Sequence, residues 1–367
     1  MNVVFSSGKI PETIAIALLV DKGLMELDDP IVKFWPEFGQ QGKEEITMGD
    51  ILGHTSGCMG TFEETPDYAV LQDDLLRDKF LASQKLSFPR GTVGYRGASS
   101  ALYTDAVVRR VDPKKRSLLQ LVQEDLFSPL EQNIFCPPVS SEVWEERMSK
   151  VHDIPLTTMM LGVLPQIFLR DFFRRVLGED HPSVLDDSEV ELFHNWVLKD
   201  DPSSPFAQPG IPDMDLGEVA WNNRSGFFSY PMMSANCVTN ARGTGSALDA
   251  FMRGDIVSKT TLEKFLKLTS GPNIKDNFLY ANVTYLAGGF GNGGIGKEAG
   301  IFDDVPRGAD CTGWGGLGGS TVVHCLVGTH NVTLSYVPNG LSPRVTLDRG
   351  FKLLNEAVGI LLEEGLA

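Results

Sequence analysis

The first apolar segment of the chain has the spacing of a helix. Apolar residues recur every three or four positions over 9–22, which is the period of a helix with one buried face. Gly23 is a natural residue to end this helix. Pro11 lacks a backbone N–H and is tolerated only in the first turn of a helix. The helix is therefore predicted to begin close to Ser6.

Similar spacing predicts helices along much of the remaining chain. The predicted segments are 46–52, 99–111, 117–127, 142–151, 156–177, 188–198, 244–252, 258–268 and 344–364. Loops rich in glycine and proline at 53–57 and 89–95 separate the first of these helices.

After residue 275 the pattern changes to that of strands. The segments 278–286, 320–327 and 332–337 have strand composition, and Gly328-Thr329-His330-Asn331 is a hairpin signal between the last two. These features predict an α+β fold. We divide the chain into a mainly helical region, 1–272, and a strand-rich region with a C-terminal helix, 273–367.

Composition excludes some functions. The chain has 32 Lys and Arg against 48 Asp and Glu, a net charge of −16, which argues against nucleic acid as a partner. The histidines show no metal-ligand spacing, and no cofactor fingerprint is present, so we expect neither a metal nor a cofactor. The scattered cysteines contain no Cys-x-x-Cys pair, which favours reduced thiols. They are Cys58, Cys136, Cys237, Cys311 and Cys325.

The longest apolar run, 156–169, is too short to span a membrane and contains Pro165. With its basic continuation, 170–175, it is interpreted as a buried or lid-like helix, and a membrane-touching surface within 156–177 is the alternative. No targeting signal is present in this sequence. Because we expect the start of the chain to be incomplete, its localisation is unknown, with the cytoplasm as the default.

Ser6 and Lys9 form a Ser-x-x-Lys motif. On a helix, side chains three apart lie on the same face. A serine hydroxyl becomes a good nucleophile when a neighbouring base takes its proton, and a desolvated amine near a helix N-terminus can act as that base. The simpler interpretation is an N-cap serine followed by a solvated lysine, because the motif alone is expected about once by chance.

A series of further motifs follows in order. The series includes Phe5-Ser6-Ser7-Gly8-Lys9, Leu27-Asp28-Asp29-Pro30, Leu52-Gly53-His54-Thr55-Ser56-Gly57, 89–95, Ser234-Ala235-Asn236 and Trp314-Gly315-Gly316-Leu317-Gly318-Gly319-Ser320, with shorter matches at 35–38, 46–47, 109–113, 129–130 and 241–242. Together these motifs resemble the serine β-lactamase and penicillin-binding-protein superfamily, in particular its class C-like, esterase-like branch. The resemblance implies an antiparallel sheet flanked by helices plus a mainly helical part, forming one catalytic domain.

The resemblance also implies roles for individual residues. Ser6 is expected to be the nucleophile, Lys9 its proton acceptor, and Tyr95 the group that carries the proton to the leaving group. The backbone N–H groups of Ser6 and Leu317 are expected to form an oxyanion hole, in which one donor typically contributes about 2.7–4 kcal/mol. Taken alone, Tyr95 would be interpreted as an ordinary loop aromatic.

Other positions are expected to contact the substrate. Trp314, Gly315 and Gly316 fall where many members have Lys-Thr-Gly or His-x-Gly, on a strand lining the site. The alternatives are core filling for the tryptophan and tight strand packing for the glycines. Asn236 is expected to shape the rim of the site. His54 belongs to a loop that is structural in this family, so we do not assign it a catalytic role.

Three departures from the family pattern matter. Gly97 stands where the family's Tyr-x-Asn element has asparagine, and Trp314 replaces a cationic or imidazole residue. Both changes remove partners of β-lactam or peptide substrates and favour esters. The chain also begins just before the serine motif, where relatives carry further residues. This predicts a truncated form lacking the first sheet strands, with an exposed sheet edge and lower stability.

The sequence therefore predicts a serine hydrolase that forms an acyl-enzyme and acts on a small ester or amide, most simply as a carboxylesterase. A catalytically impaired scaffold that only binds ligands or partner proteins is the alternative from another class. Peptidase or transacylase chemistry with the same residues is a third. The oligomeric state is not predicted.

Overall fold

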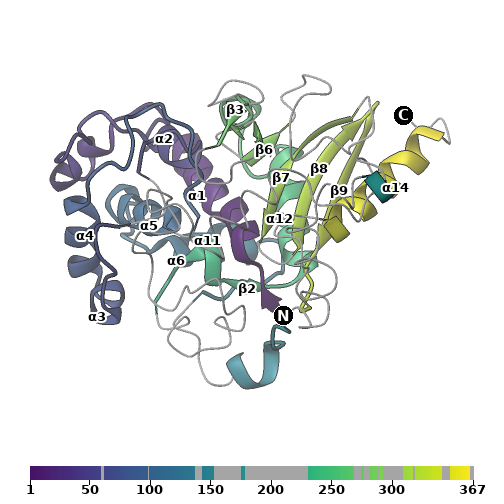
Figure 1. Ribbon diagram of the computed structural model, residues 1–367, viewed down its shortest axis with the longest axis horizontal. Helices are drawn as coiled ribbons and strands as arrows, with labels where there is room; N and C mark the ends of the chain where they lie inside the picture. Colours follow the sequence, from purple (N-terminus) through teal and green to yellow (C-terminus); the bar gives the residue numbers. More distant parts are fainter. Residues whose placement is uncertain are drawn as a thin grey trace.

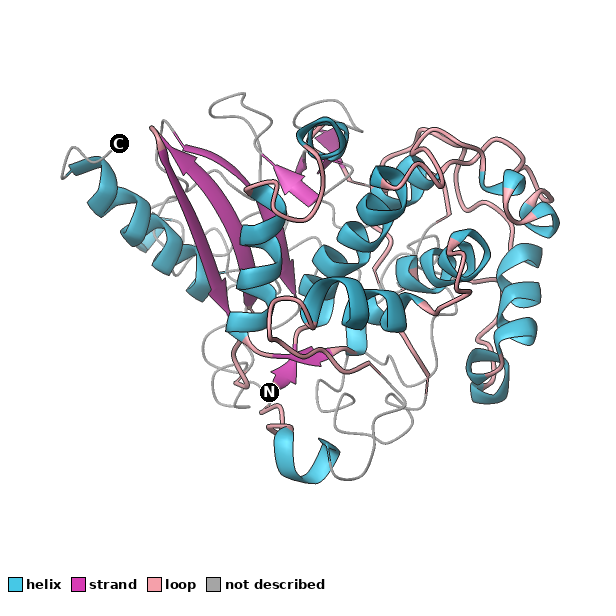
Figure 2. Cartoon of the chain, turned by 180° about the vertical axis from the view of Figure 1, so that it is seen from behind, coloured by secondary structure: helices cyan, strands magenta, loops and turns pink. Residues whose placement is uncertain are grey.

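The computed structural model combines helices with an antiparallel sheet (Figures 1 and 2). It describes residues 1–58, 62–97, 99–136, 143–152, 175–177, 230–267, 274–276, 282–283, 285–286, 289–291, 309–316, 319–340 and 348–363. Helices from the first part of the chain lie on one side, and the sheet lies on the other. The predicted α+β class is confirmed.

Helix α1 (Lys9–Asp21) lies between these two parts (Figure 1). It follows a short 3₁₀ turn, η1 (Phe5–Gly8), and residues 9–20 are all buried. A helix buried on every side belongs to the centre of a core. It contacts α5 and α6 on the helical side and β6 and β7 of the sheet. Pro11 occupies its first turn, as the sequence predicts.

The helical side is built from short helices around α1. They are α2 (Met48–Leu52), α3 (Tyr68–Gln72), α4 (Asp74–Ser83), α5 (Ser100–Val111), α6 (Leu118–Val122) and the π-helical turn η4 (Gln123–Phe127). Thr47 and Ser117 start α2 and α6 with capping boxes, in which their hydroxyls accept the backbone N–H three residues on. Helices α3 and α4 were not predicted from the sequence.

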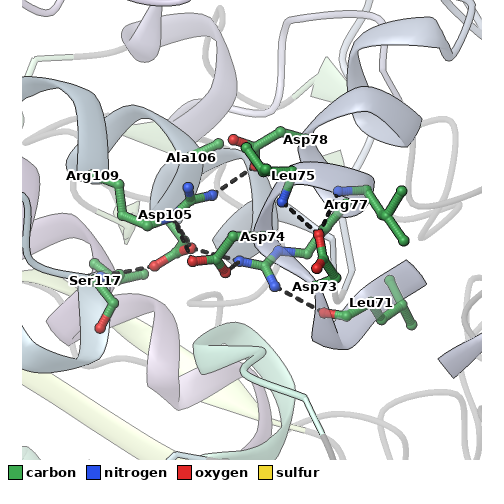
Figure 3. A network of polar contacts seen from close by, with 12 residues as sticks. Leu71, Asp73, Asp74, Leu75, Arg77, Asp78, Asp105, Ala106, Arg109 and Ser117 are labelled. Carbon is green, nitrogen blue, oxygen red and sulfur yellow. Dashed lines mark hydrogen bonds and ion pairs between the residues drawn. The ribbon is translucent and has the colours of Figure 1, made fainter. Parts of the chain in front are cut away.

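A buried network of ion pairs joins α4 to α5 (Figure 3). Arg77, whose side chain is 1% exposed, donates to Asp105 at 2.9 Å and to Asp74 at 2.5 Å. Arg109 bridges Asp105 at 2.9 Å and Asp78 at 2.6 Å. Buried charges are tolerated when each has a partner. The network therefore fixes the position of α5 against α4.

The sheet is antiparallel, with strand order β5-β6-β7-β8-β9. The strands are β5 (Tyr285–Leu286), β6 (Gly289–Gly291), β7 (Ala309–Gly316), β8 (Ser320–Val327) and β9 (His330–Tyr336). The predicted hairpin joins β8 to β9 through Gly328, whose φ is 59°, and Val327 pairs with His330. Glycine adopts this left-handed conformation at no steric cost.

Helices cover both faces of the sheet. Thr321 and His324 of β8 point to opposite faces because side chains alternate along a strand. Thr321 lies beside Gly350 of α14 (Asp348–Glu363), and His324 lies 4.0 Å from Asp249 of α12 (Ala241–Met252). Helices α12 and α14 thus pack on opposite sides of β8 (Figure 2).

The remaining elements are short. They are β1 (Asn2–Val3), which pairs with β2 (Val238–Thr239), β3 (Ile274–Lys275), which pairs with β4 (Asn282–Val283), η2 (Ile31–Lys33), η3 (Pro36–Phe38), η5 (Val143–Arg147), α11 (Met233–Asn236) and α13 (Lys259–Phe265). The predicted helix 188–198 and most of 156–177 lie outside the described residues. The division of the chain at residue 272 stays a prediction.

The expectation of reduced thiols is wrong for four of the cysteines. Cys136 is bonded to Cys237 and Cys311 to Cys325, whereas Cys58 is a buried free thiol. The first bond joins residues 101 positions apart in the sequence, and the second joins directly opposed residues of β7 and β8. Neither pairing has a local spacing signal, which is why the sequence did not reveal them.

Candidate active site

Ser6 lies in the turn η1, immediately before α1. Its neighbour Phe5 has a positive φ of 46°, which is rare for a residue other than glycine. Gly8 packs so closely on α11 that a Cβ there would lie 1.9 Å from the Met233 carbonyl oxygen. A strained residue and a close backbone contact thus fix the turn, and strained residues of this kind cluster at functional sites.

The Lys9 amine lies beneath Ser6. The Lys9 side chain is buried, and its Nζ lies 3.3 Å from the Ser6 Oγ. Nζ also donates to the carbonyl oxygen of Gly97 and, at 3.4 Å, to that of Ser234. Burial lowers the pKa of Lys9 from its ordinary 10.5 to about 7, with the Glu12 carboxylate opposing this shift and the Arg96 guanidinium adding to it. Neutral amine is therefore available near pH 7.

Tyr95 reaches Ser6 from a loop far along the chain. Its hydroxyl donates to the Ser6 Oγ at 2.5 Å, and its ring centroid lies 4.9 Å from the Lys9 Nζ. Burial raises the pKa of the Tyr95 phenol well above its ordinary value, although the hydrogen bond to Ser6 opposes this change. The phenol is therefore a proton donor at neutral pH. Ser6, Tyr95 and Gly97 are half-buried, so solvent reaches this side of the site.

The loop that carries Tyr95 is held by the His54 loop. The Gly94 N–H donates to the His54 carbonyl at 3.0 Å, and the Arg96 N–H donates to the His54 Nδ1 at 3.0 Å. Burial lowers the pKa of the His54 ring well below its ordinary value, so the ring is neutral. Gly57 has a φ of 73° and lies against the Phe88 carbonyl, where no side chain would fit. These contacts position Tyr95 and agree with a structural role for His54.

Trp314 of β7 closes one side of the site. The side chain is 2% exposed, and one of its rings lies 5.8 Å from the Lys9 Nζ. Gly316 allows β7 to approach η1, because a Cβ there would lie 2.8 Å from the Val4 carbonyl oxygen and 3.0 Å from the Phe5 Cβ. Gly315, the other predicted glycine, pairs with Thr321 of β8.

The roles predicted for Leu317 and Asn236 stay predictions. Leu317 lies outside the described residues, so its part in an oxyanion hole with the Ser6 N–H stays a prediction. Asn236 is buried, and its amide accepts from the Met232 N–H and donates to the Tyr230 carbonyl, both at 3.0 Å. These bonds hold the segment that carries the Ser234 carbonyl. The role of Asn236 at the rim also stays a prediction.

Several buried polar groups around these residues were not predicted from the sequence. Glu12 follows Lys9 by one turn, and Arg96 adjoins Tyr95. Asp276 accepts a hydrogen bond from the Tyr285 hydroxyl at 2.8 Å, and the Tyr285 ring lies 6.4 Å from the ring of Trp314. Of these residues, only Glu12 could have been noticed in the sequence, because it is a charged residue within a segment that is otherwise almost wholly apolar.

Two further findings concern the described residues as a whole. These residues contain no group of three or more His, Cys, Asp or Glu side chains placed to hold a metal ion. Nor does any helix in this part of the chain have the length and apolar character required to cross a membrane.

Comparison with known proteins decides the family. The beta-lactamase family model matches residues 3–358. The chain belongs to the beta-lactamase family. Its fold is β-lactamase-like, and hydrolases, including esterases, are among its relatives.

One curated relative and two solved structures are similar to this chain. The chain is 29% identical to "Esterase/beta-lactamase LipL" of Mycobacterium tuberculosis over 128 residues, which are 35% of this chain and 29% of that protein. A penicillin-binding protein homolog from Caulobacter crescentus has a TM-score of 0.69 at 20% identity, covering 98% of this chain and 83% of its own. A family VIII carboxylesterase has a TM-score of 0.66 at 20% identity, covering 98% and 82%. At such identities the two structures show the fold alone.

Proposed function

We propose that the chain is a serine hydrolase that forms an acyl-enzyme on Ser6 and acts on small esters, in the manner of a carboxylesterase. The observation that carries the proposal is the convergence of Lys9 and Tyr95 on one hydroxyl, at 3.3 Å and 2.5 Å. A hydroxyl flanked by a base and an acid is the arrangement that nucleophilic catalysis requires.

The orientation of Lys9 supports its role as the base. A neutral amine has two N–H donors and one lone pair. The backbone carbonyls of Gly97 and Ser234 accept hydrogen bonds from Nζ, and the Ser6 hydroxyl is the third polar group in contact with Nζ. With both donors engaged, the lone pair is directed to the Ser6 hydroxyl. The lowered pKa of Lys9, about 7, keeps a large share of the amine neutral.

The reaction proceeds in two halves. In acylation, Lys9 takes the proton from Ser6 while the Oγ forms a bond to the substrate carbonyl carbon. Tyr95 then donates its proton to the departing alkoxide, the carbon–oxygen bond to the alcohol breaks, and Lys9 returns a proton to the phenolate. In deacylation, a water molecule takes the place of the alcohol, gives up its proton by the same route and releases the acid and Ser6. Neither half requires a metal or a cofactor.

A preference for esters follows from two positions. Gly97 offers only backbone where an asparagine amide would bond to an amide-bearing substrate, and Trp314 offers no charge to a substrate carboxylate. Relatives whose names include esterase support this choice. A site that lacks a required hydrogen-bond partner discriminates strongly against the substrate that needs it.

Labelling with a fluorophosphonate probe tests the proposal. The wild-type chain is expected to form a covalent adduct on Ser6 and to hydrolyse p-nitrophenyl butyrate. Ser6→Ala is expected to lose the adduct and at least about 10³-fold of the turnover, because the nucleophile is gone. Ser83→Ala, which removes an exposed hydroxyl on α4, is the control. A folded wild-type chain that is neither labelled nor active would contradict the proposal.

A further inference from the structure

A buried carboxylate lies one helical turn beyond Lys9. Glu12 is 1% exposed, and residues three apart on a helix have neighbouring side chains. Among the described residues, no lysine or arginine nitrogen is within ion-pair distance of this carboxylate. A carboxyl group placed so deeply without a contacting cation is costly. It therefore calls for an explanation beyond packing.

Two hydroxyl groups of α5 hold Glu12. Thr104 Oγ1 lies 2.8 Å from Oε1, and Ser100 Oγ lies 3.2 Å from Oε2. Thr104 Oγ1 also lies 3.1 Å from the Ser100 carbonyl oxygen. A hydroxyl can donate to an ionised carboxylate, or accept from a protonated one while donating elsewhere. Thr104 has a partner in either case, so the surroundings of Glu12 accommodate both protonation states.

Charges on several elements surround this pair. Glu12 and Lys9 lie on the same helix. Arg96 and Tyr95 belong to a neighbouring loop, and the His54 ring packs against the Tyr95 ring. The negative charge of Asp276 raises the pKa of Tyr95. Glu12 is the group among these whose charge favours an ammonium at Lys9 most strongly.

We propose that Glu12 is a positioning residue for the hydrolysis proposed above, on which this inference rests: its buried carboxylate attracts the proton that Lys9 takes from Ser6. When Lys9 accepts that proton, an ammonium forms in a site with little solvent. A fixed negative charge one turn away stabilises it, and the two hydroxyls of α5 keep that charge in place. Glu12 does not touch the substrate and acts only through Lys9.

The pKa directions agree with this role. Burial lowers the pKa of Lys9, and Glu12 opposes that shift. Burial raises the pKa of Glu12 above its ordinary value, and the charges of Lys9 and Arg96 and the hydrogen bonds of Thr104 and Ser100 oppose this rise. Without the carboxylate, burial and Arg96 act on Lys9 unopposed, so its pKa falls further. The amine then remains neutral to lower pH but becomes a weaker base.

The pH profile of kcat/KM for p-nitrophenyl butyrate tests the inference. Glu12→Gln keeps the size of the side chain and removes its charge. We expect the acid limb of the profile to move down by about one pH unit or more, because an opposite charge nearby typically shifts a pKa by that amount. The plateau is expected to fall about three- to tenfold, because a weaker base transfers the proton less efficiently. Glu12→Asp is expected to restore the limb in part.

A second variant and a control complete the test. Thr104→Val removes one donor to Glu12, which favours the protonated carboxyl and so moves the limb in the same direction by a smaller amount. If Glu12→Gln does not fold, the pH profile of Thr104→Val tests the inference in its place. Thr13→Val removes another buried hydroxyl of α1 and is expected to leave the limb in place. An active wild-type chain whose limb is unmoved in the Glu12 and Thr104 variants overturns this inference alone. An inactive, unlabelled wild-type chain overturns the proposed function with it.

Discussion

The Tyr95 hydroxyl lies 2.5 Å from the Ser6 Oγ although 89 positions separate the two residues in the sequence. Ser6 is fixed by the turn before α1, and Tyr95 is fixed by a loop that bonds to His54. The contact therefore depends on two independently held backbone segments. This arrangement allows the hydroxyl of Tyr95 to be removed without disturbing Ser6.

Tyr95→Phe is expected to lower kcat for ester hydrolysis by about 10²- to 10⁴-fold, the usual contribution of a positioned acid or base. The ring remains to pack against Lys9 and Trp314, so the melting temperature should change little. Steady-state kinetics and thermal unfolding measure the two effects. Tyr336→Phe, on β9, is the control and should leave kcat unchanged. A Tyr95→Phe variant with wild-type kcat would remove Tyr95 from the mechanism.

Lys9→Met is expected to raise the stability of the fold while it abolishes turnover. The pKa of Lys9 falls from 10.5, its ordinary value, to about 7 on folding. Between these values the unfolded chain binds the proton more tightly, so stability rises with pH, and the penalty is fully present below the folded pKa. The gain in melting temperature should thus be larger at about pH 6 than at about pH 9. Differential scanning calorimetry at both pH values measures it, and an equal gain at both would contradict a lowered pKa.

Gly97→Asn is expected to shift the substrate preference towards β-lactams. Gly97 is half-buried, and among the described residues a Cβ there would meet only the Tyr95 ring, at 3.9 Å, so these residues leave room for an asparagine side chain. Its amide would supply the hydrogen-bond partner that an amide substrate lacks in the wild-type site. We expect the ratio of kcat/KM for nitrocefin to that for p-nitrophenyl butyrate to rise about tenfold, the worth of one hydrogen bond. Gly97→Ala, which adds volume without an amide, should leave the ratio unchanged.

Asp105→Ala is expected to destabilise the chain by about 3–5 kcal/mol, because it leaves buried arginine charge without its partner. Asp105 is 7% exposed and contacts both Arg77 and Arg109 (Figure 3). Asp74→Ala removes a carboxylate that also contacts Arg77 but is 55% exposed, so its effect should stay below about 1 kcal/mol. Urea unfolding of the two variants compares them. Equal losses would mean that burial does not set the strength of this network.

Patterns in the sequence predicted those helices and turns that are determined by residues close together in the chain. The apolar spacing of α1, the turn residues of the β8–β9 hairpin and the amphipathic pattern of α14 all correspond to structure. Helix α4 escaped prediction because its apolar residues do not mark a buried face. Leu75 is 79% exposed, whereas Arg77 is buried. The burial of Arg77 depends on Asp105, a partner on another helix that no periodicity reveals.

The candidate site divides in the same way. Ser6 and Lys9 are neighbours on one turn, so their proximity is readable from spacing. Tyr95 required a family resemblance, because nothing local relates it to Ser6. The importance of Glu12 appears only once its burial and its two hydroxyl partners on α5 are known. The pairing of Cys136 with Cys237 likewise depends on the tertiary fold, which brings the two distant residues together.

Solvent reaches the nucleophile from the edge marked by Ser6, Tyr95 and Gly97, while Lys9 is enclosed beneath them. Under the proposed mechanism, the departing alcohol and the incoming water can both pass this exposed edge. The alcohol has to diffuse away before hydrolysis can finish. A second alcohol supplied in excess would meet the acyl group at that same edge and divert it from water.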